Sequence, residues 1–515
     1  MTFYKSSAIL LGLSLFLLCI GIILLFCIPT IVHLLLSKNL PLSNGSLTFK
    51  IWSDIPIPVY QKIYFFNITN PDDILKGEKP IFKEVGPYIY KAHWYKENIT
   101  FHENSTISYR EIKTYKFMRN LSNGDTDDII STINAPMVVA ATLVENSSLW
   151  VKLALNAVFW ATRERLFIKK TVKELTYTGY RDPLMVLAPV INPKVPNHNG
   201  YFAWLFGKND TDDGLYNVFT GKSTLEKLNI IDKLNDKNKF FAWNSTCSMM
   251  NGTNGEFNPP LLKNQQEIHI FQTDICRSWY LDYKEDSELF KIPSKRFEAG
   301  ISVLQNASEN PANACFNVGK NLPSGAMDIS PCQFGAPVVL SYPHFYLADP
   351  SYLRAVKGLS PEPLKHKWFM DLEPITGLTV NASVRLQINL YLKKINFIWP
   401  FYKLSPAPLV FPVLWQEVTF YVTEDLAEVL KSKIFKPQLY AKISSYLSIG
   451  LAVLLILSAF IIHILLNKKQ KSADDDPLLG CGSSDDNIYS HTNDILKENG
   501  RINHDDDDEP AIRDV

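Results

Sequence analysis

Two long apolar runs constrain the fold of this chain more than any other feature. The first, Ala8 to Leu36, contains no Lys, Arg, Asp or Glu, and the second runs from Tyr446 to Leu466. A bilayer core of ~30 Å needs about 20 helical residues. The sequence therefore predicts membrane-spanning helices over residues 8–36 and 443–466. The first run is long enough to tilt, or Pro29 could kink or end it.

A cleaved signal peptide is the alternative interpretation of the first run. Such a peptide has a shorter apolar core and a small-residue cleavage site, and neither is obvious here. Basic residues then give the orientation of an uncleaved span. Lys468, Lys469 and Lys471 follow the second run and Lys5 precedes the first, so both termini are expected in the cytosol. Residues 37–442 would lie in an organelle lumen or outside the cell.

Glycosylation sequons provide an independent test of this orientation. The chain contains eleven Asn-X-Ser/Thr triplets, all of them between the two spans and none in the tails. This distribution is typical of a glycosylated lumenal domain. The predicted sites are Asn44, Asn67, Asn98, Asn104, Asn120, Asn146, Asn209, Asn244, Asn251, Asn306 and Asn381.

The cysteines agree with an oxidising compartment. Four lie between the spans, namely Cys247, Cys276, Cys315 and Cys332. An even number predicts two disulfides, with three pairings open at this point. Zinc binding is the alternative, but the chain has no CxxC pair to support it.

The charge is unevenly distributed. The chain has 52 basic and 52 acidic residues, yet residues 467–515 hold six basic and thirteen acidic ones. This tail, at −7 and without apolar periodicity, is expected to be disordered and cytosolic. The first 36 residues carry +1, which leaves residues 37–466 mildly basic at +6. No basic excess points to a nucleic-acid partner, and 46% hydrophobic residues exclude disorder for the bulk of the chain.

Alternating polar and apolar residues predict antiparallel β-structure in the loop between the spans. The runs are residues 47–52, 58–68, 87–95, 107–117 and 384–392. Residues 148–175 differ, because they lack Gly and Pro and are rich in Leu, Ala, Lys and Glu, so they predict a helix. This helix is apolar on most sides and is therefore either buried in the core or part of a contact surface.

The chain shows no sequence motif of catalysis. It has no GxSxG, HExxH, P-loop or GxGxxG motif, and its ten His residues are scattered. We therefore expect neither an enzyme nor a bound cofactor or metal.

Six strings resemble one known family. EVGPYIY (84–90), GYRDPL (179–184), MNGTNG (250–255), TDICRS (273–278), LSYPHFYLADP (340–350) and LEPITGLTV (372–380) stand in this order between the spans. Together with the topology and the sequons, they closely resemble the class B scavenger receptor family. That family includes fatty-acid translocase, the high-density-lipoprotein receptor and the lysosomal integral membrane proteins. The resemblance covers about residues 45–466.

The resemblance implies an α+β fold. In this fold a large lumenal antiparallel β-barrel carries a helical bundle at its membrane-distal apex, and a hydrophobic tunnel runs through it toward the bilayer. Residues 148–175 would form the apical helices. The resemblance also implies disulfides Cys247–Cys315 and Cys276–Cys332. Fatty-acid translocase has a third bridge, whose cysteine is replaced here by Asn317.

The function that the resemblance implies is the binding of lipids, such as fatty acid, cholesterol, phospholipid or lipoprotein, and their passage to the membrane. The alternative is a sorting receptor that carries a lumenal hydrolase, such as β-glucocerebrosidase, through its apical helices. Candidate apical contacts are the apolar and basic side chains Leu155, Val158, Phe159, Trp160, Arg163, Arg165 and Phe167. The oligomeric state, including a homo-oligomer, is not fixed by the sequence.

The tail contains a candidate sorting signal. An acid, Asp474, precedes the pair Leu478-Leu479 by four residues, which matches an acidic dileucine signal for a clathrin adaptor. Tails of the lysosomal branch of the family carry such a signal, so we predict a lysosomal or late endosomal membrane, with the plasma membrane as alternative. Cys481 is a candidate for acylation.

Overall fold

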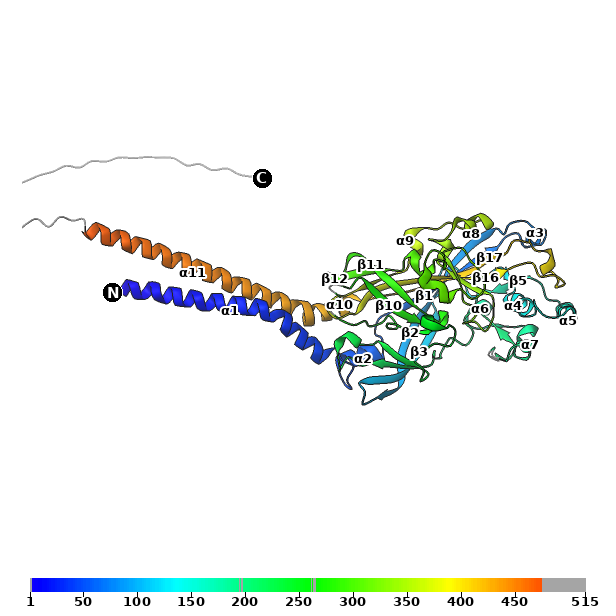
Figure 1. Cartoon of the computed structure of the whole chain (residues 1–515), viewed down its shortest axis with the longest axis horizontal. Helices are drawn as coiled ribbons and strands as arrows, with labels where there is room; N and C mark the ends of the chain where they lie inside the picture. Colours follow the sequence, from blue (N-terminus) through cyan, green and yellow to red (C-terminus); the bar gives the residue numbers. More distant parts are fainter. Residues whose placement is uncertain (1, 194, 196–197, 261, 263–264, 475–515) are drawn as a thin grey trace, which may run out of the picture. The chain divides into compact units, whose positions relative to one another are not determined.

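The computed structural model describes residues 2–193, 195, 198–260, 262 and 265–474 (Figure 1). The chain divides into two compact units, one made of Met1–Ile20 with Ser448–Val515 and the other of Gly21–Leu447. The long helices α1 (Thr2–Asn39) and α11 (Lys436–Asp474) each contribute to both units.

The first unit contains the start of α1 beside α11. The Ser448 hydroxyl donates a hydrogen bond to the Leu17 carbonyl at 2.8 Å, so these two helices are in contact there. Within the residues that the structure describes, two helical stretches are long and apolar enough to cross a bilayer, Ser7–Asn39 and Glu424–Lys469. Both predicted spans fall within these stretches. Pro29 lies inside α1 and does not end the helix.

A large antiparallel sheet forms the centre of the second unit. Its ladder follows the order β10-β11-β12-β15-β16-β17-β1-β2-β3-β8-β9, and off this path β14 pairs with β16 and β13 pairs with β14. The strands are β1 (Val59–Ile68), β2 (Phe82–Phe101), β3 (Thr106–Phe117), β8 (Leu215–Phe219), β9 (Ile231–Leu234), β10 (Glu267–Gln272), β11 (Arg277–Leu289), β12 (Ile292–Glu298), β13 (Ala326–Asp328), β14 (Val338–Ser341), β15 (Phe369–Leu372), β16 (Thr379–Leu392) and β17 (Leu409–Tyr421).

Among the residues that the structure describes, the ladder does not close into the predicted barrel of paired strands. Its edge strands β9 and β10 are instead bridged by a short segment of loop. Ile231 N donates to Gly252 O at 2.9 Å, and Phe271 N donates to Thr253 O at 2.9 Å. Gly252 has φ +92°, and a Cβ atom there would lie 1.9 Å from the His269 carbonyl oxygen. Only glycine lets this segment approach both edges so closely.

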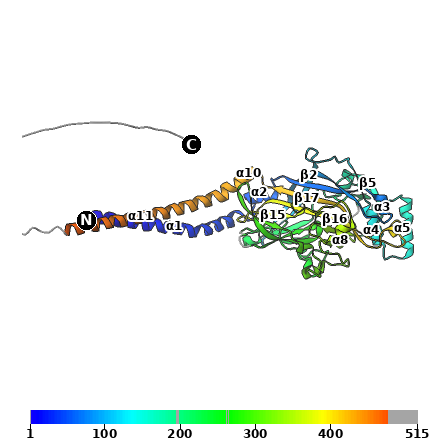
Figure 2. The same cartoon turned by 90° about the horizontal axis from the view of Figure 1, so that it is seen from above.

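Shorter elements surround the sheet. The helices α4, α5 and α7 gather at the end of the second unit that lies opposite α2 and α10 (Figures 1 and 2). The bounds are α2 (Leu47–Ser53), α3 (Pro71–Ile74), α4 (Ala135–Leu143), α5 (Leu149–Ala161), α6 (Val172–Leu175), α7 (Pro183–Ile191), α8 (Pro350–Ala355), α9 (Pro363–His366), α10 (Glu424–Leu430), β4 (Ile129–Ile133), β5 (Phe167–Thr171), β6 (Tyr180–Arg181) and β7 (Tyr201–Phe202).

The predicted α+β fold with a large antiparallel sheet is confirmed, and four of the five predicted strand runs are strands. The run 47–52 is the exception, because it forms α2. The Ser46 hydroxyl accepts a hydrogen bond from Phe49 N at 3.1 Å and caps the helix. Trp52, at the end of α2, packs edge-on against Tyr109 with ring centroids 4.7 Å apart. The alternating polar and apolar residues of the run 47–52 therefore belong to a short helix, and the buried face of this helix contacts the sheet.

The prediction of one helix over residues 148–175 is also wrong in extent. Helix α5 ends at Ala161, and Arg163 takes a left-handed conformation with φ 57°. Residues 167–171 then pair with β4 as β5, and α6 follows. Ile168 and Thr171 are β-branched and favour a strand. A partner strand remote in sequence therefore overrides the local helix preference.

Candidate functional site

Helix α5 lies at the end of the unit remote from α2 and α10 (Figure 2). It presents an aromatic face to solvent. Trp150 is 80% exposed and Trp160 is 84% exposed, and Leu153 lies exposed between them. These three residues share one face of the helix, because they are spaced by three and by seven residues, about one and two turns. Two exposed tryptophans on one face indicate a contact surface, because an indole ring buries a large apolar area when it contacts a partner.

The side chains predicted as apical anchors divide into two groups. Leu155 and Phe159 are buried in the main core, and Val158 is half-buried against it. We correct that prediction, because a side chain already packed inside the domain cannot contact a partner. Phe167 is also half-buried and stacks on Phe411, with ring centroids 6.1 Å apart. The other candidates remain accessible, namely Trp160, Arg163 and Arg165.

A loop from the C-terminal half of the chain joins this surface. The Asn156 side chain donates from Nδ2 to the Phe397 carbonyl at 2.7 Å and accepts from Trp399 N at 2.9 Å. These two bonds hold the loop against α5. Phe397, Trp399 and Tyr402 are exposed on it. We define the distal aromatic surface as Trp150, Trp160, Phe397, Trp399 and Tyr402.

The sequence reasoning missed this loop. Its signal was the aromatic run FIWPFY at residues 397–402. Four aromatic residues out of six, interrupted by Pro400, are unusual for an ordinary strand and typical of an exposed contact loop. Without the structure, nothing connected this run to α5, some 240 residues away.

The four cysteines between the two apolar runs form two disulfides. Cys247 bonds to Cys315 and Cys276 bonds to Cys332, and in each pair the Cα atoms are 5.9 Å apart. These are the two pairs that the family resemblance implies. The zinc alternative is therefore excluded for these four residues. In the described part of the chain, no group of three or more His, Cys, Asp or Glu side chains could hold a metal ion.

The predicted sequons differ in exposure. Eight of the eleven asparagines are exposed, whereas Asn67, Asn306 and Asn381 are half-buried. Asn67 Oδ1 accepts from Ser131 N at 2.8 Å. Asn381 Nδ2, the atom that a glycan would modify, donates to Asp371 Oδ2 at 3.0 Å. The predicted sorting residues Leu478 and Leu479, and Cys481, lie outside the described residues, and Asp474 is the last residue of α11.

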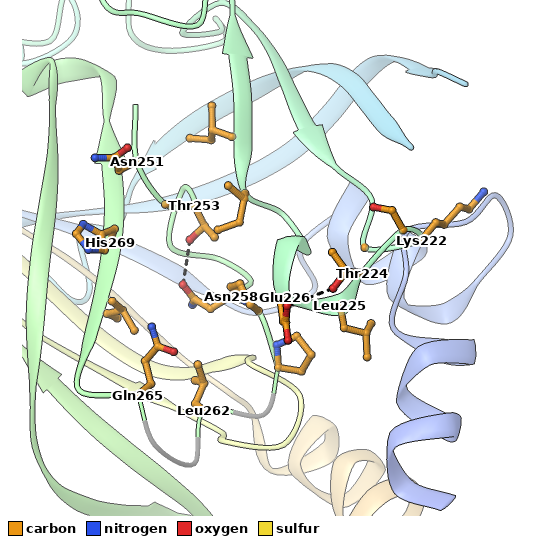
Figure 3. A pocket seen from close by; sticks show the side chains of 18 of the residues that line it. Lys222, Thr224, Leu225, Glu226, Asn251, Thr253, Asn258, Leu262, Gln265 and His269 are labelled. Carbon is orange, nitrogen blue, oxygen red and sulfur yellow. Dashed lines mark hydrogen bonds between the residues drawn. The ribbon is translucent and has the colours of Figure 1, made fainter. Parts of the chain in front are cut away.

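A cavity of about 1030 Å³ lies beside the end of α1, within the second unit (Figure 3). His33 and Ser37 of α1 form one wall, and the loop after β8 (residues 221–226) forms another. The bridging segment around Thr253 and residues 258–260 complete it. We call it the juxtamembrane cavity, because Ser37 directly follows the apolar run 8–36. Sequence reasoning gave no sign of it, since its walls come from segments far apart in the chain.

A chain of alternating charges lies inside the sheet. Lys96 Nζ is 2.7 Å from Glu256 Oε2 and 2.9 Å from Glu111 Oε1. Lys113 Nζ then contacts Glu111 at 3.5 Å and Asp213 at 2.8 Å. Burial and the Glu111 charge raise the pKa of Glu256 to about 8. Burial also acts to raise the pKa of Glu111, but Lys96 and Lys113 outweigh it and hold that pKa at about 2.

Two helices long and apolar enough to cross a bilayer, together with a disulfide-bonded α+β domain between them in sequence, are consistent with a two-span membrane protein. The model of the CD36 family matches residues 11–463, and the chain belongs to that family. Scavenger receptor class B member 1 of Cricetulus griseus is 35% identical over 452 residues, which cover 87% of this chain and 88% of the relative. The resemblance to class B scavenger receptors is thereby confirmed.

A second group of relatives carries a lysosomal name. Lysosome membrane protein 2 of Rattus norvegicus is 36% identical over 403 residues, which cover 78% of this chain and 82% of the relative. Lysosome membrane protein 2 of Homo sapiens is 36% identical over 404 residues, with the same coverage. The two groups are about equally similar to this chain, so the identities alone do not assign it to either branch.

Proposed function

We propose that this protein is a lipid receptor that binds a lipid-bearing particle at the distal aromatic surface and passes lipid through its domain to the membrane. Membership of the CD36 family supports a lipid-related receptor. The single observation that carries the binding step is the exposure of Trp150 and Trp160 on one face of α5. Exposed Trp beside Arg163 and Arg165 suits the boundary of a lipid surface, where indole rings and basic side chains both find partners.

The passage of lipid needs an apolar route. Moving a hydrocarbon chain out of a bilayer into water costs about 0.8 kcal/mol per CH₂, or ~12 kcal/mol for a chain of about 16 carbons. An apolar tunnel, as the family resemblance implies, removes most of this cost because the chain never enters water. The flow then follows the lipid gradient and needs no energy source. This agrees with a sequence that has no nucleotide-binding motif.

A transfer assay with the full chain tests this proposal. Proteoliposomes that contain the protein are mixed with donor vesicles carrying a fluorescent fatty acid or sterol ester. We expect faster transfer than into protein-free liposomes, and a loss of most of that gain in the double variant W150S/W160S. The exposed control K237W should transfer as wild type. Equal transfer with and without protein would contradict the proposal.

The second candidate function is a sorting receptor for a lumenal hydrolase such as β-glucocerebrosidase. The relatives named lysosome membrane protein 2 favour a lysosomal membrane, whereas those named scavenger receptor class B member 1 leave the plasma membrane open. The apolar face of α5 could receive a partner helix. A pull-down of β-glucocerebrosidase by the full chain discriminates the two functions. Loss of the partner in W150S/W160S with intact lipid transfer favours the sorting receptor.

Sorting depends on the tail in either case. We propose that Asp474, Leu478 and Leu479 form a dileucine signal that a clathrin adaptor binds. Changing both leucines to alanine should move the protein from endosomes and lysosomes to the cell surface. Unchanged endosomal staining would contradict the signal.

A further inference from the structure

Two buried histidines stack on each other beside helix α9. His344 is 6% exposed and His366 is 3% exposed, and their rings lie 4.5 Å apart at an interplanar angle of 8°. His344 belongs to the turn Pro343–Phe345, and His366 is the last residue of α9 (Figure 1). We call these two side chains the imidazole pair. Neither ring belongs to the distal aromatic surface or to the juxtamembrane cavity, so the functions proposed above do not use them.

Both rings accept a hydrogen bond from the same short segment of backbone. Ser360 N donates to His344 Nδ1 at 3.0 Å. Glu362 N donates to His366 Nδ1 at 2.8 Å. A backbone N–H can only donate, so each Nδ1 must present a lone pair, and the ring hydrogen of each neutral histidine is then on Nε2. The two contacts therefore require that neither Nδ1 carries a proton.

The segment 360–365 that these bonds hold lies on the surface, and within it only residue 361 is half-buried. Residue 361 is a proline without an N–H, so the two N–H groups of residues 360–362 both donate to the imidazole pair. Arg385 of β16 holds the other end, because its Nη1 donates to the Lys367 carbonyl at 2.7 Å. The imidazole pair thus fixes the start of the segment, and Arg385 fixes its end.

Charged groups face the imidazole pair from several strands. His344 Nε2 lies 2.5 Å from Glu84 Oε2, and the same oxygen accepts from Trp415 Nε1 at 2.7 Å. The Trp415 ring is edge-on to both imidazoles, with centroid distances of 6.4 and 5.6 Å. Glu84 is thus the carboxylate in contact with the pair. The titratable and charged groups around the pair are Glu84 on β2, Lys62 and Tyr64 on β1, Arg385 on β16, Glu417 on β17, and Glu362 and Lys365 at α9.

The surroundings set the order in which the two rings take up protons. Burial acts to raise the pKa of Glu84, but hydrogen bonds from His344 and Trp415 outweigh it and lower that pKa below its ordinary value. Glu84 therefore stays ionised in mild acid and favours a first proton on His344. Burial and the neighbouring His344 lower the pKa of His366 to about 4. A second proton, on His366, places two positive rings 4.5 Å apart in a buried site, where they repel each other.

A proton changes what each Nδ1 can do. A charged imidazole carries hydrogen on both ring nitrogens, so its Nδ1 becomes a donor and faces a backbone N–H that is also a donor. Both bonds to the segment 360–365 are then lost. We propose that acid releases residues 360–365 from the sheet by protonating His344 and His366. The segment would be held in compartments near neutral pH and released in the acidic lumen of a late endosome or lysosome.

Amide hydrogen exchange tests this proposal without a lipid ligand or a partner protein. The full chain in nanodiscs is labelled with deuterium between pH 7 and pH 4, and the rates are corrected for the intrinsic pH dependence of amide exchange. We expect the protection of the Ser360 and Glu362 amides to fall about tenfold or more over this range. Strand β10 should keep its protection, which shows that the release is local. Unchanged protection of both amides at pH 4 would overturn the proposal.

Three variants test the role of the rings. Asparagine places an amide oxygen near the position of Nδ1 and takes up no proton in this range, so H344N/H366N should stay protected at pH 4. E84Q removes the carboxylate that favours the charged ring and should move the release about one pH unit lower. H93N, at an exposed histidine of β2, is the matched control and should behave as wild type. Equal release of wild type and H344N/H366N, or release of E84Q at the wild-type pH, would overturn the proposal.

If H344N/H366N fails to fold, a second measurement on the wild-type chain decides. Exchange of the imidazole C2 hydrogen, read by mass spectrometry, reports the protonation of each ring separately. We expect His344 and His366 to take up protons over the same pH range in which the amides of residues 360–362 lose protection. Rings that charge while these amides stay protected would overturn the proposal. Because no lipid or partner enters either measurement, the result is independent of the functions proposed above.

Discussion

The ammonium nitrogen of Lys96 lies 2.7 Å from Oε2 of Glu256, and the Lys96 side chain is completely buried. The same nitrogen lies 5.0 Å from the centroid of the Trp52 ring. Trp52 belongs to α2, the first element after α1. The contact between Lys96 and the Trp52 ring therefore links the segment that follows the first apolar run to the interior of the sheet. Glu111 provides the second carboxylate for Lys96, so two acids and one cation share one apolar site.

The two acids should respond differently to the same substitution. Glu111 is ionised and balances the buried Lys96, so E111Q leaves Lys96 without an ionised partner, whereas Lys113 keeps Asp213. Breaking a buried pair in this way costs ~3–5 kcal/mol. Glu256 has a pKa of about 8 and is protonated at neutral pH, so E256Q keeps its charge state and nearly its shape. Its cost should be within about 1 kcal/mol. Urea unfolding of the detergent-solubilised chain measures both. Equal losses of unfolding free energy in E111Q and E256Q would show that Glu256 is ionised.

Stability should depend on pH through Glu256. Its pKa is raised from 4.5 to about 8 on folding, so the folded chain binds a proton that the unfolded chain releases. This contribution is fully present below about pH 4.5 and is lost as the pH rises to about 8. We expect the melting temperature of wild type to fall over this window relative to that of E256Q.

The contribution of His366 to stability has the opposite pH dependence, so the experiment must control for it. Burial and the neighbouring His344 lower the pKa of His366 to about 4, so its contribution is lost as the pH falls. Because E256Q retains His366, the difference between wild type and E256Q isolates the Glu256 contribution. If the melting temperatures of wild type and E256Q changed equally with pH, the contribution of Glu256 would be refuted.

Some of these features were predictable from the sequence for physical reasons. The long helix over residues 8–36 was predictable from composition alone, because an apolar run of this length without a charged residue is typical of a helix that can cross a bilayer. The run 58–68 was recognisable as a strand, since its alternation matches β1, where inward and outward side chains also alternate.

Other features depend on contacts between remote residues. Leu155 and Phe159 looked like anchors because periodicity shows which side chains share a face and not which face meets the core. The Asn156–Phe397 bond joins segments that no local pattern connects. Likewise, Glu256 follows a glycine-rich turn, and only the arrival of Lys96 and Glu111 on β2 and β3 makes its carboxyl a buried acid.

The two faces of α5 should separate stability from binding. Phe159 is 1% exposed, so F159A leaves a cavity in the core and should cost ~3–5 kcal/mol. W150S/W160S changes two exposed side chains and should alter stability by only about 0.5 kcal/mol. The same variant should lower binding to lipid vesicles about tenfold or more, since each indole buries apolar area at the lipid surface. Unfolding curves and vesicle flotation test the two effects. Normal flotation of W150S/W160S would exclude α5 as the lipid-binding face.

Glycan occupancy should follow the hydrogen bonds of the asparagine side chains. Asn381 Nδ2 donates to Asp371, and the Asp371 carboxylate also accepts from Arg296 Nε at 2.8 Å. A glycan on Nδ2 would force its sugar toward this buried ion pair. Asn98, by contrast, is exposed at the irregularity in the β2–β3 register between Glu97 and Thr100. We expect glycopeptide mapping to find Asn98 modified and Asn381 unmodified. Correspondingly, N98Q should increase electrophoretic mobility by one glycan, whereas N381Q should not. A glycopeptide containing Asn381 would contradict the geometry of this site.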